Sequence, residues 1–121
     1  MRFVAFAFAF SVAIAEPALA DDAAPIKIQA TEAGAHVGEN ATVVGVLTGV
    51  HKTSSKSVLW DIGGQYPDNP FTGYVNKRDT DVIPDLTPLV GKTIAVTGLI
   101  KLYQNKPEIN VTDVKQVAVA P

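Results

Sequence analysis

Two tyrosines and four lysines have side chains suited to binding a ligand by ring stacking and by charge. They are Tyr74, Tyr103, Lys52, Lys56, Lys101 and Lys106. A ring stacked on a base contributes about 1–3 kcal/mol to single-strand binding, and scattered cations contact the phosphates. The set therefore fits sequence-tolerant binding of a single-stranded nucleic acid or another polyanion. The same residue types are also usual in solvated turns, so this plainer interpretation stays open for each of them.

Residues that typically carry catalysis are few. The chain has no cysteine and two histidines, His36 and His51. Three serines stand close to His51 in the sequence, but the sequence gives no sign of a buried acid that would orient the histidine as in a serine triad. Those serines are Ser54, Ser55 and Ser57. We therefore expect a protein that is not an enzyme.

Metal and cofactor signals are equally weak. Two short pairs of possible ligands occur, His36 with Glu39 and Asp79 with Asp81. Neither pair supplies a ligand set that fixes a coordination geometry. No glycine-rich phosphate loop or dinucleotide motif is present, so we expect no cofactor.

The first 20 residues have the pattern of a signal peptide. Arg2 supplies a positive charge, residues 3–15 are uncharged and apolar, and Ala18-Leu19-Ala20 fits a cleavage site. The apolar run is too short to span a membrane. We expect cleavage after Ala20, with Ala15 as the less favoured alternative. The mature protein is then exported, and a periplasmic location suits a chain without cysteine.

The net charge of the whole chain is −2. Proteins that bind nucleic acid tightly without sequence preference usually carry a basic surface. The overall charge shows no such surface, although a local basic patch remains open.

The ligand-binding candidates belong to a chain that alternates between apolar and polar residues. Residues 21–35 look like a loosely held lead-in, in which residues 30–35 can form one helical turn capped by Thr31. The remainder, residues 36–121, reads as one domain. Five strands are expected there. Their ranges are 41–50, 56–63, 71–76, 92–103 and 107–119. Pro84 and Pro88 allow only short helical pieces between the third and fourth strands.

Glycines inside the expected strands favour a curled, closed sheet over a flat one. They are Gly45, Gly49, Gly73 and Gly98. Glycine weakens a strand unless it permits a bend or a close approach. Five strands with a short helical link between the third and fourth match the plan of the OB-fold, an all-β Greek-key barrel.

Three motifs also carry a resemblance to a known family. They are VGENATVVGV at residues 37–46, LWDIGGQYPDNPFT at 59–72, and GKTIAVTGLIKLYQNKPEI at 91–109. Together they resemble the OB-fold nucleic-acid-binding family, and in particular small exported bacterial members. The resemblance covers nearly all of the mature chain. It implies the fold strongly and the ligand weakly, because OB-folds also bind sugars, peptides and proteins.

Strand alternation separates a core face from an outer face. The expected core set is Val58, Trp60, Ile62, Phe71, Gly73, Val75, Ile94, Val96, Ile100 and Leu102. Trp60 is expected to be buried, with a stacking role as the alternative.

OB-folds bind on the face of the second and third strands, between the loops that join strands 1–2 and 4–5. This rule predicts a binding site composed of Lys52, Lys56, Leu59, Asp61, Thr72, Tyr74, Lys101, Tyr103, Asn105 and Lys106. The ligand is a single-stranded nucleic acid or another polyanion in the first hypothesis. In the second it is a protein, a peptide or a small ligand, which the acidic balance of the chain and the export signal favour, and Asp61 counts against a nucleic acid.

Overall fold

A computed structural model describes residues 25–120, so the expected signal peptide lies outside the described residues. The strands are β2 (Ile26–Gln29), β3 (Asn40–Lys52), β4 (Val58–Ile62), β5 (Phe71–Val75), β6 (Thr93–Tyr103), β7 (Lys106–Asn110) and β8 (Val117–Val119). Short 3-10 helices are η3 (Ala30–Ala35), η4 (Lys77–Asp79), η5 (Thr87–Leu89) and η6 (Val114–Gln116).

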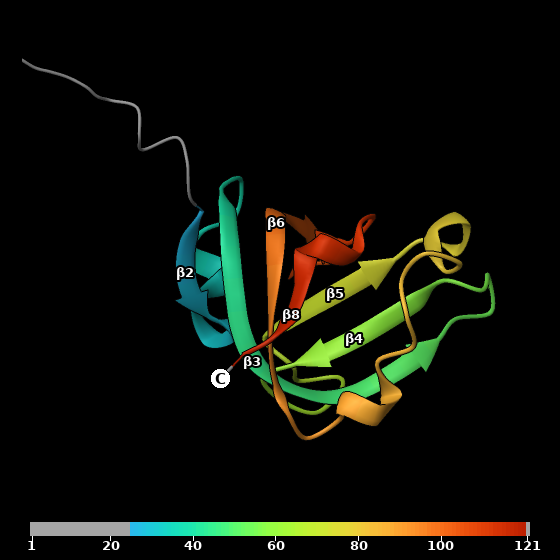
Figure 1. The fold of residues 1–121 in the computed structure, drawn as a ribbon. Helices are drawn as coiled ribbons and strands as arrows, with labels where there is room; N and C mark the ends of the chain where they lie inside the picture. Colours follow the sequence, from blue (N-terminus) through green and yellow to red (C-terminus); the bar gives the residue numbers. More distant parts are fainter. Residues whose placement is uncertain (1–24, 121) are drawn as a thin grey trace, which may run out of the picture.

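The strands form one sheet that closes on itself. Neighbouring strands follow the order β2-β3-β4-β5-β7-β6-β8, and an additional pairing joins β3 to β6. The strand β3 makes this closure possible because it pairs along its first half with β6 and along its second half with β4. A register irregularity between Leu47 and Gly49 separates the two halves, and the strand bends through it (Figure 1). The expected all-β architecture with a long, bent first strand is confirmed.

The ends of the barrel differ from the sequence prediction. Residues 26–29, expected in a loose lead-in, form β2, which pairs in parallel with β3. The single expected strand at residues 107–119 is divided into β7, η6 and β8. Asp113 interrupts it, because its side chain accepts a hydrogen bond from Lys115 N and begins η6. The described part of the sheet therefore has seven strands instead of five.

The short helical segments agree with the sequence prediction except for one cap. Residues 30–35 form the helical turn η3, but its N-cap is Gln29, whose backbone N–H donates to Glu32 Oε1 at 2.8 Å. Thr31 lies inside the turn, so its predicted role as a cap was wrong. The link from residue 76 to 92 contains only the single turns η4 and η5. This is the broken helix that Pro84 and Pro88 predict.

The core lies inside the barrel and contains Trp60, which is fully buried. Its neighbour across the strand pair is Gly73, where an added Cβ would lie 2.5 Å from Trp60 Cε3. A glycine at this position is therefore required to make room for the indole beside β5. The predicted core is confirmed for most of its members, with Leu102 as an exception at 56 % exposure. Leu102 has the predicted orientation, but it lies in the β6–β7 hairpin next to the turn, where no further strand of residues 25–120 covers it.

Candidate ligand-binding face

A row of paired residues crosses five neighbouring strands on the outer face of the barrel, and four of its five members have polar side chains. The register joins Gly49 to Asp61, Asp61 to Thr72, Thr72 to Glu108 and Glu108 to Lys101. Their strand neighbours Trp60, Ile100 and Ile109 point the other way and are buried. We name this surface the outer face. It is the face on which the sequence analysis placed Leu59, Asp61, Thr72 and Lys101.

Asp61 is a buried carboxylate at the centre of the outer face. It is 2 % exposed, and its Oδ2 lies 2.5 Å from Nε2 of the half-exposed His51. Gly49 makes room for this pair, because an added Cβ would lie 2.9 Å from Asp61 Oδ2 and 3.3 Å from His51 Nε2. The carboxylate therefore has a partner that is accessible to solvent.

The loop between β4 and β5, residues 63–70, folds over the edge of the outer face. The Tyr66 ring lies 5.6 Å from the His51 ring and 5.9 Å from Lys106 Nζ. Lys106 Nζ donates hydrogen bonds to the Pro67 carbonyl and, at 3.1 Å, to Asn69 Oδ1. Asn69, 2 % exposed, in turn donates from Nδ2 to Phe71 O and to Thr72 Oγ1. One lysine and one buried amide thus fix the loop to the sheet.

A hollow of about 220 Å³ lies between this loop and the β6–β7 hairpin. It is lined by Leu59, Asp61, Tyr66, Pro67, Asn69, Thr72, Tyr103, Gln104, Lys106 and Glu108. Tyr66 and Tyr103 stand at its rim with exposures of 64 % and 60 %. We name this hollow the outer-face hollow. Two exposed aromatic rings therefore stand beside a floor that contains Leu59 together with the polar Asp61, Thr72 and Glu108.

Glu108 brings a second carboxylate to the outer-face hollow. Burial raises its pKa above the ordinary value, and the charge of Lys101 across the strand pair works in the opposite direction. A cation bound beside Glu108 would favour the charged form of this carboxyl group and would offset its partial desolvation.

Five residues of the predicted site line the outer-face hollow: Leu59, Asp61, Thr72, Tyr103 and Lys106. Lys101 lies on the same face, beside Glu108. Tyr74 also belongs to this face, but it lies one row nearer the β3–β4 loop, where its hydroxyl is 3.0 Å from Ser57 Oγ.

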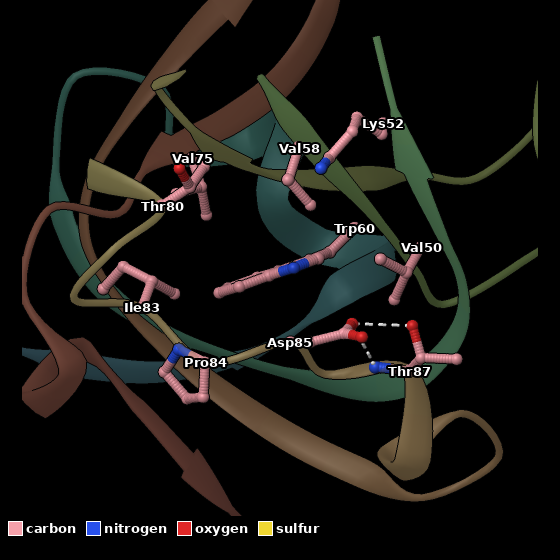
Figure 2. A pocket seen from close by; sticks show the side chains of 10 residues that line it. All are labelled: Val50, Lys52, Val58, Trp60, Val75, Thr80, Ile83, Pro84, Asp85 and Thr87. Atoms are coloured by element: carbon pink, nitrogen blue, oxygen red, sulfur yellow. Dashed lines mark hydrogen bonds between the residues drawn. The ribbon is translucent and has the colours of Figure 1, made fainter. Parts of the chain in front are cut away.

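Three predicted residues do not join them. Lys52 was expected in a loop but belongs to β3, opposite Val58, so alternation turns it to the same side as Val50 and Trp60. It lines a different hollow, at the end of the barrel (Figure 2). Lys56 is exposed in the β3–β4 loop with a φ of 72°. Asn105 forms, with Gln104, a two-residue turn in which both residues have positive φ, as hairpin geometry requires.

Several residues of the outer-face hollow were missing from the predicted site. Tyr66, Pro67 and Asn69 were missed because a long loop gives no alternation from which to infer its direction. Glu108 was within reach of the sequence, since it alternates with Ile109 in the expected fifth strand. His51 was included in the first loop but not in the site, and its pairing with Asp61 became visible only with the β3–β4 register.

Two kinds of feature are not found in the part of the chain that the structure describes. No group of three or more His, Cys, Asp or Glu side chains is placed to hold a metal ion. No helix between residues 25 and 120 has the length and apolar character needed to cross a membrane.

Comparison with known proteins gives a likeness of fold. No protein-family model matches the chain, and no curated protein matches its sequence. One solved structure that is similar is a putative aspartyl-tRNA synthetase from Leishmania major Friedlin, with a TM-score of 0.51 and 8 % sequence identity. The match covers 80 % of this chain and 21 % of the synthetase chain. At this identity the likeness concerns the fold alone.

Proposed function

We propose that this protein is an exported OB-fold binding module without enzymatic activity. We further propose that its outer face binds a peptide or protein segment that carries a basic side chain. Five strands, β3, β4, β5, β7 and β6, follow one another around the barrel, and β3 pairs with β6 to close it. This order, with β5 and β7 parallel, supports assignment to the OB-fold, whose binding surface is the face of its second and third strands.

The composition of the outer-face hollow is the observation that carries the choice of ligand. Glu108 and Asp61 contribute carboxylates, and Tyr66 and Tyr103 present exposed rings at the rim. A lysine or arginine side chain is attracted both by a carboxylate and by the face of a tyrosine ring. The cavity of about 220 Å³ is a suitable size for one side chain, with the rest of the segment lying across the strands.

Binding of a single-stranded nucleic acid is the second candidate. The resemblance of the motifs and the fold likeness to a chain described as a tRNA synthetase favour it. The carboxylates of the outer face oppose it, because Glu108 lines the outer-face hollow and the buried Asp61 adds a second negative charge beneath it. Lys106 is already bonded to the β4–β5 loop, and Lys52 lies at the end of the barrel. The four lysines of the polyanion hypothesis therefore do not form one basic groove.

Fluorescence anisotropy with labelled ligands tests this proposal. The panel contains three peptides that differ only in a central arginine, glutamate or leucine, together with an oligothymidylate of similar length. We expect the arginine peptide to bind most tightly. We expect Glu108→Gln and Tyr103→Ala each to weaken it, because one removes the charge and the other a ring.

Asp81→Asn is the matched control for Glu108→Gln. It removes one negative charge from an exposed residue of the link, away from the outer face. Equal losses in the two variants would mean that only the net charge of the protein attracts the peptide, and the proposed site would be wrong. Tighter binding of the oligothymidylate than of the arginine peptide at about 50 mM salt, where phosphate contacts are strong, would favour the nucleic-acid hypothesis instead.

A further inference from the structure

A second hollow lies at one end of the barrel, on the side of the link between β5 and β6. Its volume is about 320 Å³. Ten residues line it: Val50, Lys52, Val58, Trp60, Val75, Thr80, Ile83, Pro84, Asp85 and Thr87. Figure 2 shows these side chains around Trp60, whose indole lies across the middle of the view. We name it the barrel-end hollow. It shares no lining residue with the outer-face hollow.

The sequence of the link explains why this end of the barrel remains hollow. Pro84 and Pro88 prevent a continuous helix across residues 76–92, and only the single turns η4 and η5 form. The buried Ile83 therefore reaches the barrel from an irregular segment. A space is left between the link and the ends of β3, β4 and β5.

The floor of the barrel-end hollow is apolar. Val50 and Val58 are partly buried against the core, and Trp60, Val75 and Ile83 belong to the core itself. Burying an apolar side chain against such a surface is favourable by about 25 cal/mol per Å² of apolar area removed from water. A volume near 320 Å³ is at the small end of ligand pockets, which restricts the occupant to a small molecule.

The rim of the barrel-end hollow carries one positive and one negative side chain. Asp85 accepts hydrogen bonds from Thr87 N at 3.0 Å and from Thr87 Oγ1 at 2.6 Å. These bonds, with a smaller contribution from the charge of Lys52, hold the pKa of Asp85 below its ordinary value. Lys52 forms none of the salt bridges found among residues 25–120. Its ammonium and the Asp85 carboxylate therefore remain separate groups on the same opening.

We propose that the barrel-end hollow binds a small zwitterion with an apolar side chain, the chemistry of a free apolar amino acid. The apolar side chain of the ligand enters beside Trp60 and Ile83. Its carboxylate lies near Lys52, and its ammonium lies near Asp85. This arrangement pairs both rim charges. A simple carboxylate would leave Asp85 without a partner, and a simple amine would leave Lys52 without one.

The single tryptophan of the chain provides the readout. Trp60 fluorescence is titrated with leucine and with three analogues. Compared with leucine, 4-methylpentanoate lacks the ammonium, 3-methylbutylamine lacks the carboxylate, and glycine lacks the apolar side chain. Methyl NMR signals of Val50, Val75 and Ile83 provide a second readout that does not depend on fluorescence. We expect leucine to bind about two- to fivefold more tightly than either singly charged analogue, as for partly exposed ion pairs. We expect glycine to bind at least about tenfold more weakly than leucine.

Two variants test the assignment of the rim charges. Lys52→Met should abolish the preference for leucine over 3-methylbutylamine, and Asp85→Asn should abolish the preference for leucine over 4-methylpentanoate. Lys27→Met, a change of the same kind on the exposed surface of β2, should alter neither preference. Equal binding of leucine and both analogues to the unmodified protein would overturn the proposal. So would unchanged preferences in the two rim variants, or the absence of any methyl shift at the hollow with leucine in the millimolar range.

Discussion

Replacing Lys106 by methionine distinguishes a structural lysine from a ligand-binding lysine. Lys106 Nζ donates to Pro67 O and Asn69 Oδ1, and it lies 5.9 Å from the Tyr66 ring centroid. A hydrogen bond to a charged group contributes about 1.5–3 kcal/mol when it is buried. Lys106 is only half-buried, so solvent screening reduces this value. For Lys106→Met we expect a loss of about 1–3 kcal/mol in the free energy of unfolding, including the cost of leaving Asn69 Oδ1 unpaired.

Urea denaturation measures this loss globally, and amide hydrogen exchange shows where it arises. We expect faster exchange in residues 63–70, because the variant releases the loop from β7. Lys56→Met is the matched control, since Lys56 is exposed at the tip of another loop. Its effect should stay within about 0.5 kcal/mol. Equal midpoints for the two variants, with unchanged exchange in the loop, would refute the structural role and would leave Lys106 available for a ligand.

Three other predictions concern the core, a titrating group and the amino terminus. Trp60→Ala should lower the free energy of unfolding by about 3–5 kcal/mol in urea denaturation, because it empties the centre of the core; a wild-type midpoint would contradict that placement. Burial raises the pKa of Glu108, so the folded state binds the proton of this carboxyl group more tightly than the unfolded state does. The free energy of unfolding should therefore fall as the pH rises from the unfolded pKa of Glu108 through its folded pKa. Glu108→Gln should flatten that part of the stability–pH curve, and an unchanged curve would exclude Glu108 as the cause. Intact-mass measurement of the exported protein should give a chain that begins at Asp21, whereas a cytoplasmic protein that retains Met1 would contradict the signal peptide.

The sequence predicted the barrel wall well because alternation and strand register follow from local residue patterns. Trp60, Phe71 and Ile94 are buried as expected. The glycine in β5 was recognised as a sign of a close approach, although its partner, Trp60, could be identified only from the register. Leu102 shows the limit of alternation, which predicts the direction of a side chain and not whether another strand covers it.

The candidate site was predicted in part for the same reason. Leu59, Asp61 and Thr72 lie on the outer face because their strands alternate without interruption. Lys52 was assigned to a loop, but β3 continues two residues beyond Val50, and this extension places it at the other hollow. Tyr66 could not be placed from the sequence, since long-range contacts with His51 and Lys106 determine the path of its loop.

Backbone NMR of the isotope-labelled protein during titration with the arginine peptide tests the central claim most directly. The account predicts that the largest amide shifts occur at the outer-face hollow, at Tyr66, Thr72, Tyr103 and Glu108, and that the same titration of Glu108→Gln gives smaller shifts at these residues. Oligothymidylate should produce no comparable set of shifts even near 50 mM salt, where phosphate contacts are strong. Shifts confined to other surfaces, or a larger response of the outer face to the oligothymidylate than to the peptide, would contradict the account.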